Sequence, residues 1–319
     1  MRVLALVPGG IGDQILFFPT LDDLKRTYPN AEIDVIVEPR AKDAYRVSKS
    51  VRDTLTFDFK GNNSLADWGN LLGVMRDREY DIALSLGQRW GVGLLLWLTG
   101  IPSRIGYAGG GSGFLTSPVP LNPDQYAAAM YHDLLQGLNI TTPCPEVAIS
   151  VPKKDLEWAD EEKQRLGLQK GYVLIHGGSS QLAKLKGIDK IYPAEQWVQI
   201  IQDFQQKQPD LPIVVIQGPE DAAFVNVLQQ SCGKSLKVTS PSDIGKLAAI
   251  IAGCNLMLCT DSAPMHLAVA LKVFTLALFG PTDPAKLLPV SDRFVGIKSP
   301  TNKMGDILPG TVLAKVWGG

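Results

Sequence analysis

A glycine-rich turn near the start of the chain ends on a residue with the chemistry of a general base. The turn reads PGGIGD over residues 8–13 and follows a short apolar run. Its glycines, Gly10 and Gly12 among them, allow a sharp turn and a close approach to a ligand. A carboxylate beside such a turn can accept a proton from a substrate hydroxyl, so Asp13 is the predicted base. The alternative is that Asp13 only caps the helix that starts there.

The same turn partly matches a dinucleotide-binding fingerprint, which leaves an NAD-dependent oxidoreductase as an alternative. Glu38 ends the next predicted strand, where a ribose-binding acid belongs in that motif. However, Ile15 stands where G-x-G-x-x-G requires its third glycine. Asp13 at the helix start would also repel a bound pyrophosphate.

Small, hydroxyl and basic residues follow a predicted strand in the second half of the chain. Ser179 and Ser180, in the segment HGGSS, suit phosphate oxygens through side-chain and backbone donors. Lys190 stands just before the next predicted helix. With Lys184 and Lys186, it would neutralise a diphosphate leaving group. The alternative for each lysine is a solvated surface loop.

Two later post-strand loops carry further candidates for ligand binding. Glu220 follows a strand in the segment QGPED and could hydrogen-bond ribose hydroxyls, although acidic turn residues are common there. Asp261 and Ser262 end another strand, and Pro264 starts a helix whose unpaired N–H groups favour anions. His266 lies in the first turn of that helix, where it would assist anion binding or else be a buried structural histidine.

Six segments, taken in order, resemble glycosyltransferase family 9, the ADP-heptose:lipopolysaccharide heptosyltransferases and their relatives. They are GGIGDQILFFPTLDDLKRTYP, IDVIVEP, HGGSS, DKIYPAEQW, TDSAPMHLAVAL and LFGPTDP. The resemblance implies a GT-B fold and inversion at the anomeric carbon without a metal. It also implies that Asp13 is the base that deprotonates the acceptor. The donor-binding residues it implies are Ser179, Ser180, Lys190, Glu220, Asp261, Ser262 and His266.

Apolar runs alternate with amphipathic segments along the chain, a pattern typical of β-α-β units around parallel sheets. Strands are predicted at 2–7, 32–37, 54–57, 82–86, 104–107, 172–176, 212–216, 236–238, 256–259 and 274–278. Helices are predicted at 13–27, 41–48, 65–78, 91–98, 124–138, 154–166, 193–206, 222–232, 244–253, 264–271 and 309–317.

A proline-containing stretch, TTPCPEVAISVPKK, separates the two series of elements. The chain is therefore predicted to be an α/β protein with two Rossmann-like lobes, whose parallel sheets face a central cleft. Residues 1–153 would bind the acceptor and residues 154–304 the nucleotide sugar. The C-terminal segment, 305–319, is expected to pack back on the first lobe. Ligands in such sheets bind beyond the carboxyl ends of the strands.

Composition excludes several other classes of protein. With 31 basic and 32 acidic residues among 319, the chain lacks the basic excess of a nucleic-acid binder. Its four cysteines and three histidines are too scattered for a metal centre, and none is predicted.

The N-terminal apolar run is too short for a signal peptide, so a cytoplasmic location is expected. Residues 91–98 are interpreted as a buried core helix, with peripheral contact at the inner face of the membrane as the alternative.

The predicted function is transfer of a heptose-like sugar from a nucleotide diphosphate donor to a cell-envelope glycan or glycolipid. No cofactor is expected, because the nucleotide sugar is the substrate. Besides the oxidoreductase, a sugar-nucleotide-binding protein without turnover stays open. Ala263, which replaces the glycine of the family's D-[ST]-G-x-x-H element, favours that last alternative.

Overall fold

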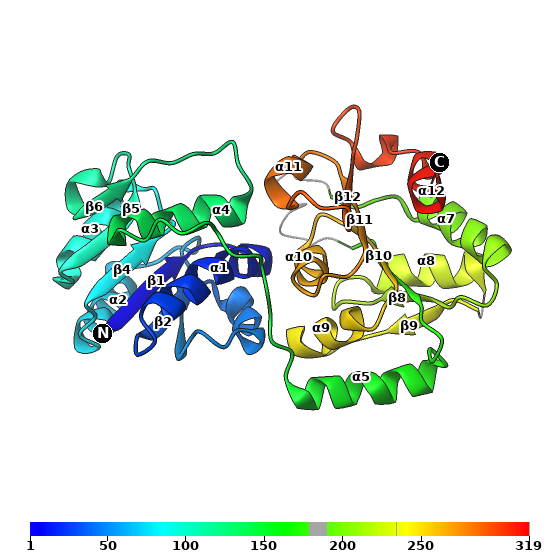
Figure 1. Ribbon diagram of the computed structural model, residues 1–319, viewed down its shortest axis with the longest axis horizontal. Coiled ribbons are helices and arrows are strands. Elements are labelled where there is room, and N and C mark those ends of the chain that lie inside the picture. Colours follow the sequence, from blue (N-terminus) through cyan, green and yellow to red (C-terminus); the bar gives the residue numbers. More distant parts are fainter. Residues whose placement is uncertain (179–189, 234, 319) are drawn as a thin grey trace. The chain divides into compact units, whose positions relative to one another are not determined.

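The structure, a computed structural model, describes residues 1–178, 190–233 and 235–318. Contacts between Cα atoms divide the chain into two compact units, Met1–Ser150 and Val151–Gly319 (Figure 1). The boundary lies within the proline-containing stretch. Each unit has its own parallel sheet of six strands, which confirms the predicted α/β class.

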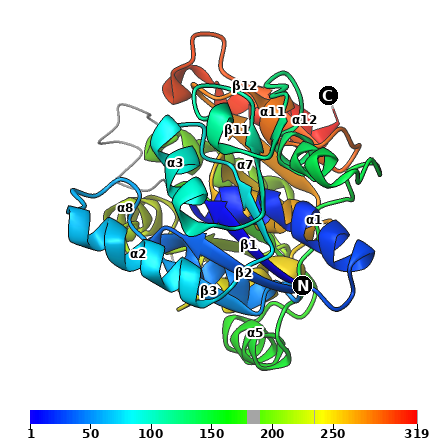
Figure 2. The ribbon, with the colours of Figure 1, turned by 90° about the vertical axis from the view of Figure 1, so that its left-hand side faces the viewer.

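The first unit has the strand order β3-β2-β1-β4-β5-β6, and all its strand pairs are parallel. The strands are β1 (Arg2–Val7), β2 (Glu32–Val37), β3 (Asp53–Thr56), β4 (Ile82–Ser85), β5 (Ser103–Tyr107) and β6 (Ser117–Val119). The helices are α1 (Ile11–Thr27), α2 (Leu65–Asp77), α3 (Trp90–Thr99) and α4 (Ala127–His132), with 3-10 helices η1 (Pro39–Val47), η2 (Ser112–Phe114) and η3 (Asp133–Leu138). Figure 2 shows α2 and α3 on one side of this sheet and α1 on the other.

The second unit repeats this plan in the order β12-β11-β10-β7-β8-β9. Its strands are β7 (Val173–His176), β8 (Ile213–Ile216), β9 (Lys237–Thr239), β10 (Leu256–Thr260), β11 (Thr275–Phe279) and β12 (Phe294–Lys298). The helices are α5 (Lys153–Leu166), α7 (Ala194–Lys207), α8 (Ala222–Cys232), α9 (Ile244–Ala252), α10 (Ala263–Ala270), α11 (Pro284–Leu287) and α12 (Pro309–Trp317), with the 3-10 helix η4 (Met304–Asp306). The strands of each sheet are parallel, but the order in which the chain adds them reverses at one place, between β1 and β4 in the first sheet and between β7 and β10 in the second. Open parallel sheets bind ligands at such a point.

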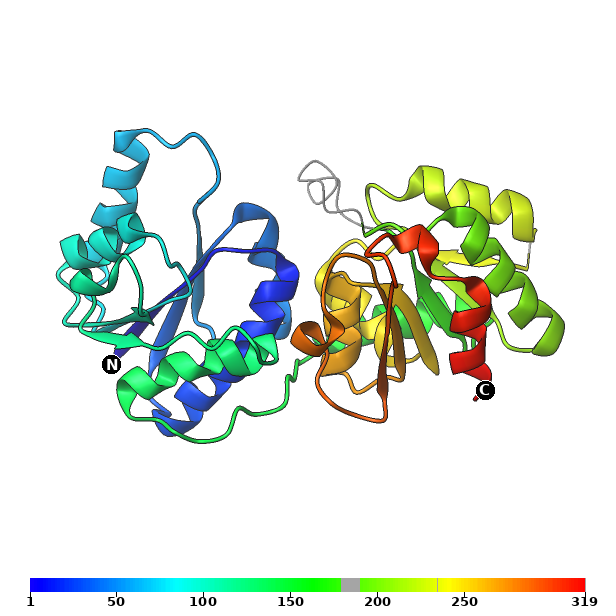
Figure 3. The ribbon, with the colours of Figure 1, turned by 90° about the horizontal axis from the view of Figure 1, so that it is seen from above.

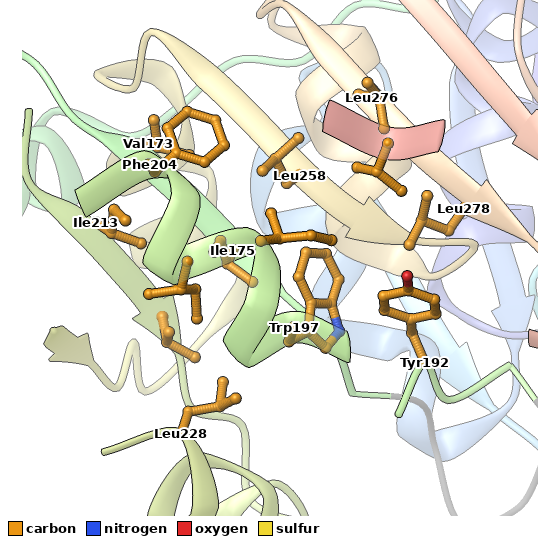
Figure 4. Packing of buried hydrophobic residues seen from close by; sticks show 14 of the residues in the cluster. Val173, Ile175, Tyr192, Trp197, Phe204, Ile213, Leu228, Leu258, Leu276 and Leu278 are labelled. Atoms are coloured by element: carbon orange, nitrogen blue, oxygen red, sulfur yellow. The ribbon is translucent and has the colours of Figure 1, made fainter. Parts of the chain in front are cut away.

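Buried apolar side chains form the core between the second sheet and α7 (Figure 4). Trp197 is fully buried, and the Tyr192 ring meets it edge-on, with 5.2 Å between the ring centroids. The Tyr192 hydroxyl donates to the carbonyl of Ile307 at 2.8 Å, so this ring also ties the C-terminal segment to the core. The strand β8 is buried along its whole length, because helices cover both faces of a parallel sheet.

The predicted position of the C-terminal segment is wrong. Helix α12 lies beside α7 in the second unit, as Figures 1 and 3 show. Val312 is fully buried in the second core, and the Trp317 ring lies 4.9 Å from the Phe204 ring. Trp317 also donates through Nε1 to Asp203 at 2.8 Å. The apolar face of α12 stays with this unit because α7 offers it an apolar surface to cover.

Among the described residues, no helix combines the length and the apolar character needed to cross a bilayer.

Candidate functional site

In the first unit, Asp13 lies in the first turn of α1, directly after the carboxyl end of β1. Its Oδ2 atom accepts a hydrogen bond of 2.7 Å from the backbone N–H of Gly10, the residue that precedes the helix. The carboxylate is therefore held by the helix start, as the capping alternative predicts. Because the side chain is only half-buried, capping leaves it accessible to a substrate. The two interpretations of Asp13 are thus compatible.

The glycine that this carboxylate requires is Gly9. A Cβ atom on Gly9 would lie 2.3 Å from Asp13 Oδ2, which no side chain can do without displacing the carboxylate. A Cβ on Gly10 would lie 3.9 Å from the same atom, and neither Gly10 nor Gly12 has a positive φ. The close approach in this turn is therefore between Gly9 and the Asp13 side chain.

Tyr131 of α4 is a partner of Asp13 that the sequence analysis missed. Its hydroxyl donates to Asp13 Oδ1 at 3.1 Å. Burial raises the pKa of Tyr131 well above its usual value, and the Asp13 carboxylate raises it further. The phenol therefore stays protonated and remains a donor. Since 118 residues separate the two side chains, no local spacing could have revealed this pair.

The features of a dinucleotide site are not assembled in this turn. The Asp13 carboxylate takes the Gly10 N–H, which a pyrophosphate at this helix start would need. Glu38, the predicted ribose-binding acid, is 3% exposed, and burial raises its pKa. A buried carboxyl with a raised pKa is a poor ligand for ribose hydroxyls.

In the second unit, four adjacent strands (β11, β10, β7 and β8) bring their following loops to one edge of the sheet. Asp261 and Ser262 follow β10, beside the backbone of Gly177 and Gly178 after β7. The Thr260 hydroxyl links the two loops by donating to the Gly178 carbonyl at 3.2 Å. This edge includes the point between β7 and β10 where the strand order reverses.

Lys190 and Asp261 form an ion pair at this edge, although 71 residues separate them. Lys190 Nζ contacts Asp261 Oδ2, and the Asp261 side chain is 4% exposed. Thr282, in the loop after β11, donates its hydroxyl to the same oxygen at 2.7 Å. The predicted diphosphate-binding lysine is thus fixed beside the end of β10.

His176 and Asp221 also belong to this edge, although the sequence analysis did not select them. Ser262 Oγ and His176 Nδ1 lie 3.2 Å apart, at hydrogen-bond distance, and His176 Nε2 lies 3.7 Å from Asp221 Oδ2. Burial lowers the pKa of His176, although the Asp221 carboxylate opposes that shift. A neutral His176 therefore faces Ser262 near pH 7.

Glu220 and its neighbour Asp221 differ in burial and in contacts. Glu220 is exposed, whereas Asp221 is 8% exposed and accepts a hydrogen bond of 2.9 Å from the Gly218 N–H. A Cβ on Gly178 would lie 2.0 Å from Asp221 Oδ1, so Asp221 packs directly against the loop after β7. The first turn of α10 holds His266, 5% exposed.

Ser179, Ser180, Lys184 and Lys186 lie outside the described residues. Among the residues that are described, no three His, Cys, Asp or Glu side chains form a group that could hold a metal ion.

Only one face of helix α3 is buried in the core. Leu95 and Leu96 are buried, as the core interpretation predicts, but Trp90 and Trp97 are 63% and 53% exposed. The helix packs closely on the glycine-rich loop at 108–113, because a Cβ on Gly93 would lie 2.8 Å from the Gly111 carbonyl oxygen. One face of α3 therefore presents large apolar side chains to solvent.

Comparisons with known proteins give a matching family and a matching fold. The family model of glycosyltransferase family 9 (heptosyltransferase) matches residues 68–315. The chain is 26% identical to the photosynthetic NDH subunit of subcomplex B 1 of Arabidopsis thaliana chloroplasts, over 98% of this chain and 72% of that protein. It is 25% identical to lipopolysaccharide heptosyltransferase 3 of Escherichia coli, over 89% and 85% of the two chains. The E. coli ADP-heptose lps heptosyltransferase II structure matches 100% of this chain and 98% of its own with a TM-score of 0.80 and 19% identity, which confirms the GT-B fold.

Proposed function

Because the chain belongs to glycosyltransferase family 9, we propose that it transfers a heptose-like sugar from a nucleotide diphosphate donor to a lipopolysaccharide-type acceptor, with inversion and without a metal. One observation carries the proposal. A half-exposed acid follows the first strand of one unit, and a cluster with a lysine follows the first strand of the other. These are the base and the leaving-group stabiliser that glycosyl transfer needs.

In the proposed reaction, Asp13 accepts the proton of the acceptor hydroxyl as that oxygen attacks the anomeric carbon. The new carbon–oxygen bond forms on the face opposite the diphosphate. The bond from the anomeric carbon to the phosphate oxygen breaks, and the nucleotide diphosphate leaves with the electron pair. Attack from the opposite face inverts the anomeric centre.

The second unit would bind the donor and stabilise the departing charge. Lys190 neutralises the diphosphate, and the N–H groups at the start of α10 donate to its oxygens. Ser179, Ser180, Ser262 and His266 are the proposed phosphate-binding residues. For the ribose we propose Glu220, as expected from its motif, with Asp221 holding the loop on which Glu220 lies.

The donor assignment is tested by a thermal-shift screen of nucleotide diphosphate sugars, each with and without EDTA. We expect ADP-heptose to raise the melting temperature equally in both conditions. Lys190→Ala should weaken ADP binding by about tenfold or more, because a charge-assisted contact to phosphate is lost. Lys207→Ala, on the outer part of α7, is the matched control and should bind ADP like the wild type. Stabilisation that disappears with EDTA would contradict metal independence.

We also propose that the exposed face of α3 contacts the membrane in which a lipid-linked acceptor lies. Tryptophan is favoured at the interface between lipid and water, and the exposed Arg89 before α3 suits anionic headgroups. The double variant Trp90→Ser, Trp97→Ser should lose sedimentation with phosphatidylglycerol vesicles. Phe274→Ser, which removes an apolar side chain that is 51% exposed on the second unit, should not. Equal sedimentation of all three proteins would contradict this contact.

A second candidate is a protein that binds the donor or a partner without turnover. The observation in its favour is the NDH subunit, which matches nearly the whole chain and is named as part of a complex. Such a protein would bind ADP-heptose yet release no ADP when a lipopolysaccharide acceptor is added.

A further inference from the structure

The loop between β11 and α11, residues 280–283, has no role in the function proposed above, yet it contacts the centre of the candidate donor site. Its Thr282 hydroxyl donates to Asp261 Oδ2 at 2.7 Å. That oxygen is also the one that pairs with Lys190. A single oxygen of a buried carboxylate therefore accepts from one charged donor and one neutral donor.

A lysine on the neighbouring strand holds this loop in place. Lys298, the last residue of β12, donates through Nζ to the Gly280 carbonyl, to the Thr282 carbonyl at 3.1 Å and to Asn302 Oδ1 at 2.7 Å. An ammonium group has three protons, and each of them has an acceptor here. A Cβ on Gly280 would lie 2.8 Å from Met304 Sδ, so the opposite side of the loop is closely packed as well.

We propose that Thr282, supported by Lys298, is a positioning residue that fixes the Asp261 carboxylate and, through it, the Lys190 ammonium. Part of this inference, the use of Lys190 on a diphosphate, rests on the proposed function. Without the hydroxyl, the buried carboxylate would keep Lys190 as its one side-chain donor among the described residues, and it could rotate toward solvent and take Lys190 with it. With the hydroxyl in place, Lys190 is oriented before any ligand arrives, which is how a charged site stabilises a leaving group without reorganising.

The first test measures the orientation of Lys190 without any substrate. The rate at which an amine-acetylating reagent modifies Lys190 is followed by mass spectrometry in Thr282→Val, Thr282→Ser and Thr275→Val. Valine keeps the shape of threonine and removes the hydroxyl, whereas serine restores it. Thr275 begins the same strand, and its hydroxyl donates to the Val273 carbonyl at 2.9 Å, so it is the matched control at the opposite end of β11.

We expect Thr282→Val to raise the acetylation rate of Lys190 about five- to tenfold, the factor that corresponds to losing one hydrogen bond of ordinary strength. In Thr282→Ser and Thr275→Val, the reagent should acetylate Lys190 at the wild-type rate. Melting temperatures show whether each variant is folded, and Thr282→Ser keeps the test valid if the valine variant unfolds, because its rate must still match the wild type. A folded Thr282→Val with the wild-type rate, or a serine variant as reactive as the valine variant, would overturn the proposal.

The second test separates this inference from the proposed function. With ADP-heptose as the donor probe, Thr282→Val should lower kcat about tenfold and change KM less than twofold, because the lost orientation matters most in the transition state. Equal loss in Thr275→Val would overturn the positioning role. If the wild-type protein released no ADP from this donor with a lipopolysaccharide acceptor, the proposed function would fail, while the acetylation result would still decide the role of Thr282.

Discussion

At the scale of single residues, each of the two candidate sites contains a carboxylate that is held by hydrogen bonds within its own unit. Asp13 accepts from Gly10 and from Tyr131 through different oxygens, so its position is set by a helix start and a distant phenol. Asp261 is held by Lys190 and Thr282. Pre-arranged groups of this kind lower the cost of organising the site when the substrate binds.

Gly9→Ala tests how closely the turn fits Asp13. The new Cβ would overlap Asp13 Oδ2, so the carboxylate must move and the Gly10 contact is lost. We expect transfer to fall at least about a hundredfold, while ADP binding, which we propose for the other unit, changes little. Gly10→Ala is the control, since its Cβ has 3.9 Å of room. Equal activity in the two variants would show that the position of Asp13 does not matter.

His176 predicts how the stability of the second unit depends on pH. Burial lowers its pKa below the ordinary 6.5, so the unfolded chain binds a proton more readily than the folded one. Stability is therefore highest above about pH 6.5 and falls as the pH decreases toward the folded pKa. Urea unfolding near pH 8 and near pH 5.5 should show this loss in the wild type and a smaller loss in His176→Asn. An identical pH dependence in both proteins would contradict this account of His176.

At the scale of elements, an ion cluster around the buried Asp34 joins β2 of the first sheet to the segments that precede β3 and follow α2. Asp34 of β2 accepts from Arg52 at 2.9 Å, from Arg78 at 2.8 Å and from Tyr80 at 2.7 Å. Burial raises the pKa of Asp34, but these hydrogen bonds outweigh it, and the net shift is downward. The cluster ties together β2, the residue before β3 and the end of α2.

Asp34→Asn should destabilise the first unit by about 3 kcal/mol, because it leaves two partly buried guanidinium groups without their shared carboxylate. Urea unfolding measures this change. Since the pKa of Asp34 is lowered, its contribution is complete above about pH 4 and is lost as the pH falls further. Asp53→Asn, which breaks an exposed contact with Arg78, is the control and should cost less than about 1 kcal/mol. Similar losses in both variants would contradict the role of burial.

The sequence predicted most elements because alternation of short apolar runs and amphipathic segments is a local signal. The strands β1 and β2 and the helix α8 have the predicted bounds. The edge strands β6 and β12 were not predicted, since β6 has only three residues and contains Pro118, and β12 contains Gly296. For the two candidate sites, the sequence indicated which loops take part but not which side chains hydrogen-bond to Asp13 and Asp261. Tyr131 is far from Asp13 in the sequence, and Thr282 is far from Asp261. The sequence also does not show that Asp221 is buried while its neighbour Glu220 is exposed.

At the scale of the whole molecule, each unit has its own sheet, core and candidate site. The second unit includes α12, although the sequence analysis placed this helix on the first unit. The prediction failed because the packing of α12 on α7 depends on the tertiary fold, which a local sequence pattern does not show. The proposed donor-binding residues all belong to this unit, and the proposed base belongs to the other.

Residues 151–319 expressed alone should therefore fold and bind ADP within about threefold of the full chain, but transfer no sugar. Calorimetry measures the affinity, and circular dichroism with a cooperative thermal transition establishes folding. Lys190→Ala in the same fragment is the control and should reduce ADP binding as it does in the full chain. A folded fragment that does not bind ADP would place part of the donor site in the first unit.

The most direct measurement compares Asp13→Asn with the wild type in two assays, acceptor-dependent release of ADP from ADP-heptose and binding of ADP. Asparagine can still accept from the Gly10 N–H and contact Tyr131, so the helix start is preserved and only the ability to take a proton is removed. The account predicts that release falls about 10²- to 10⁴-fold while the affinity for ADP stays within about twofold. Release at the wild-type rate, or an equal loss of ADP binding, would contradict the claim that Asp13 is the base acting on a donor held by the second unit.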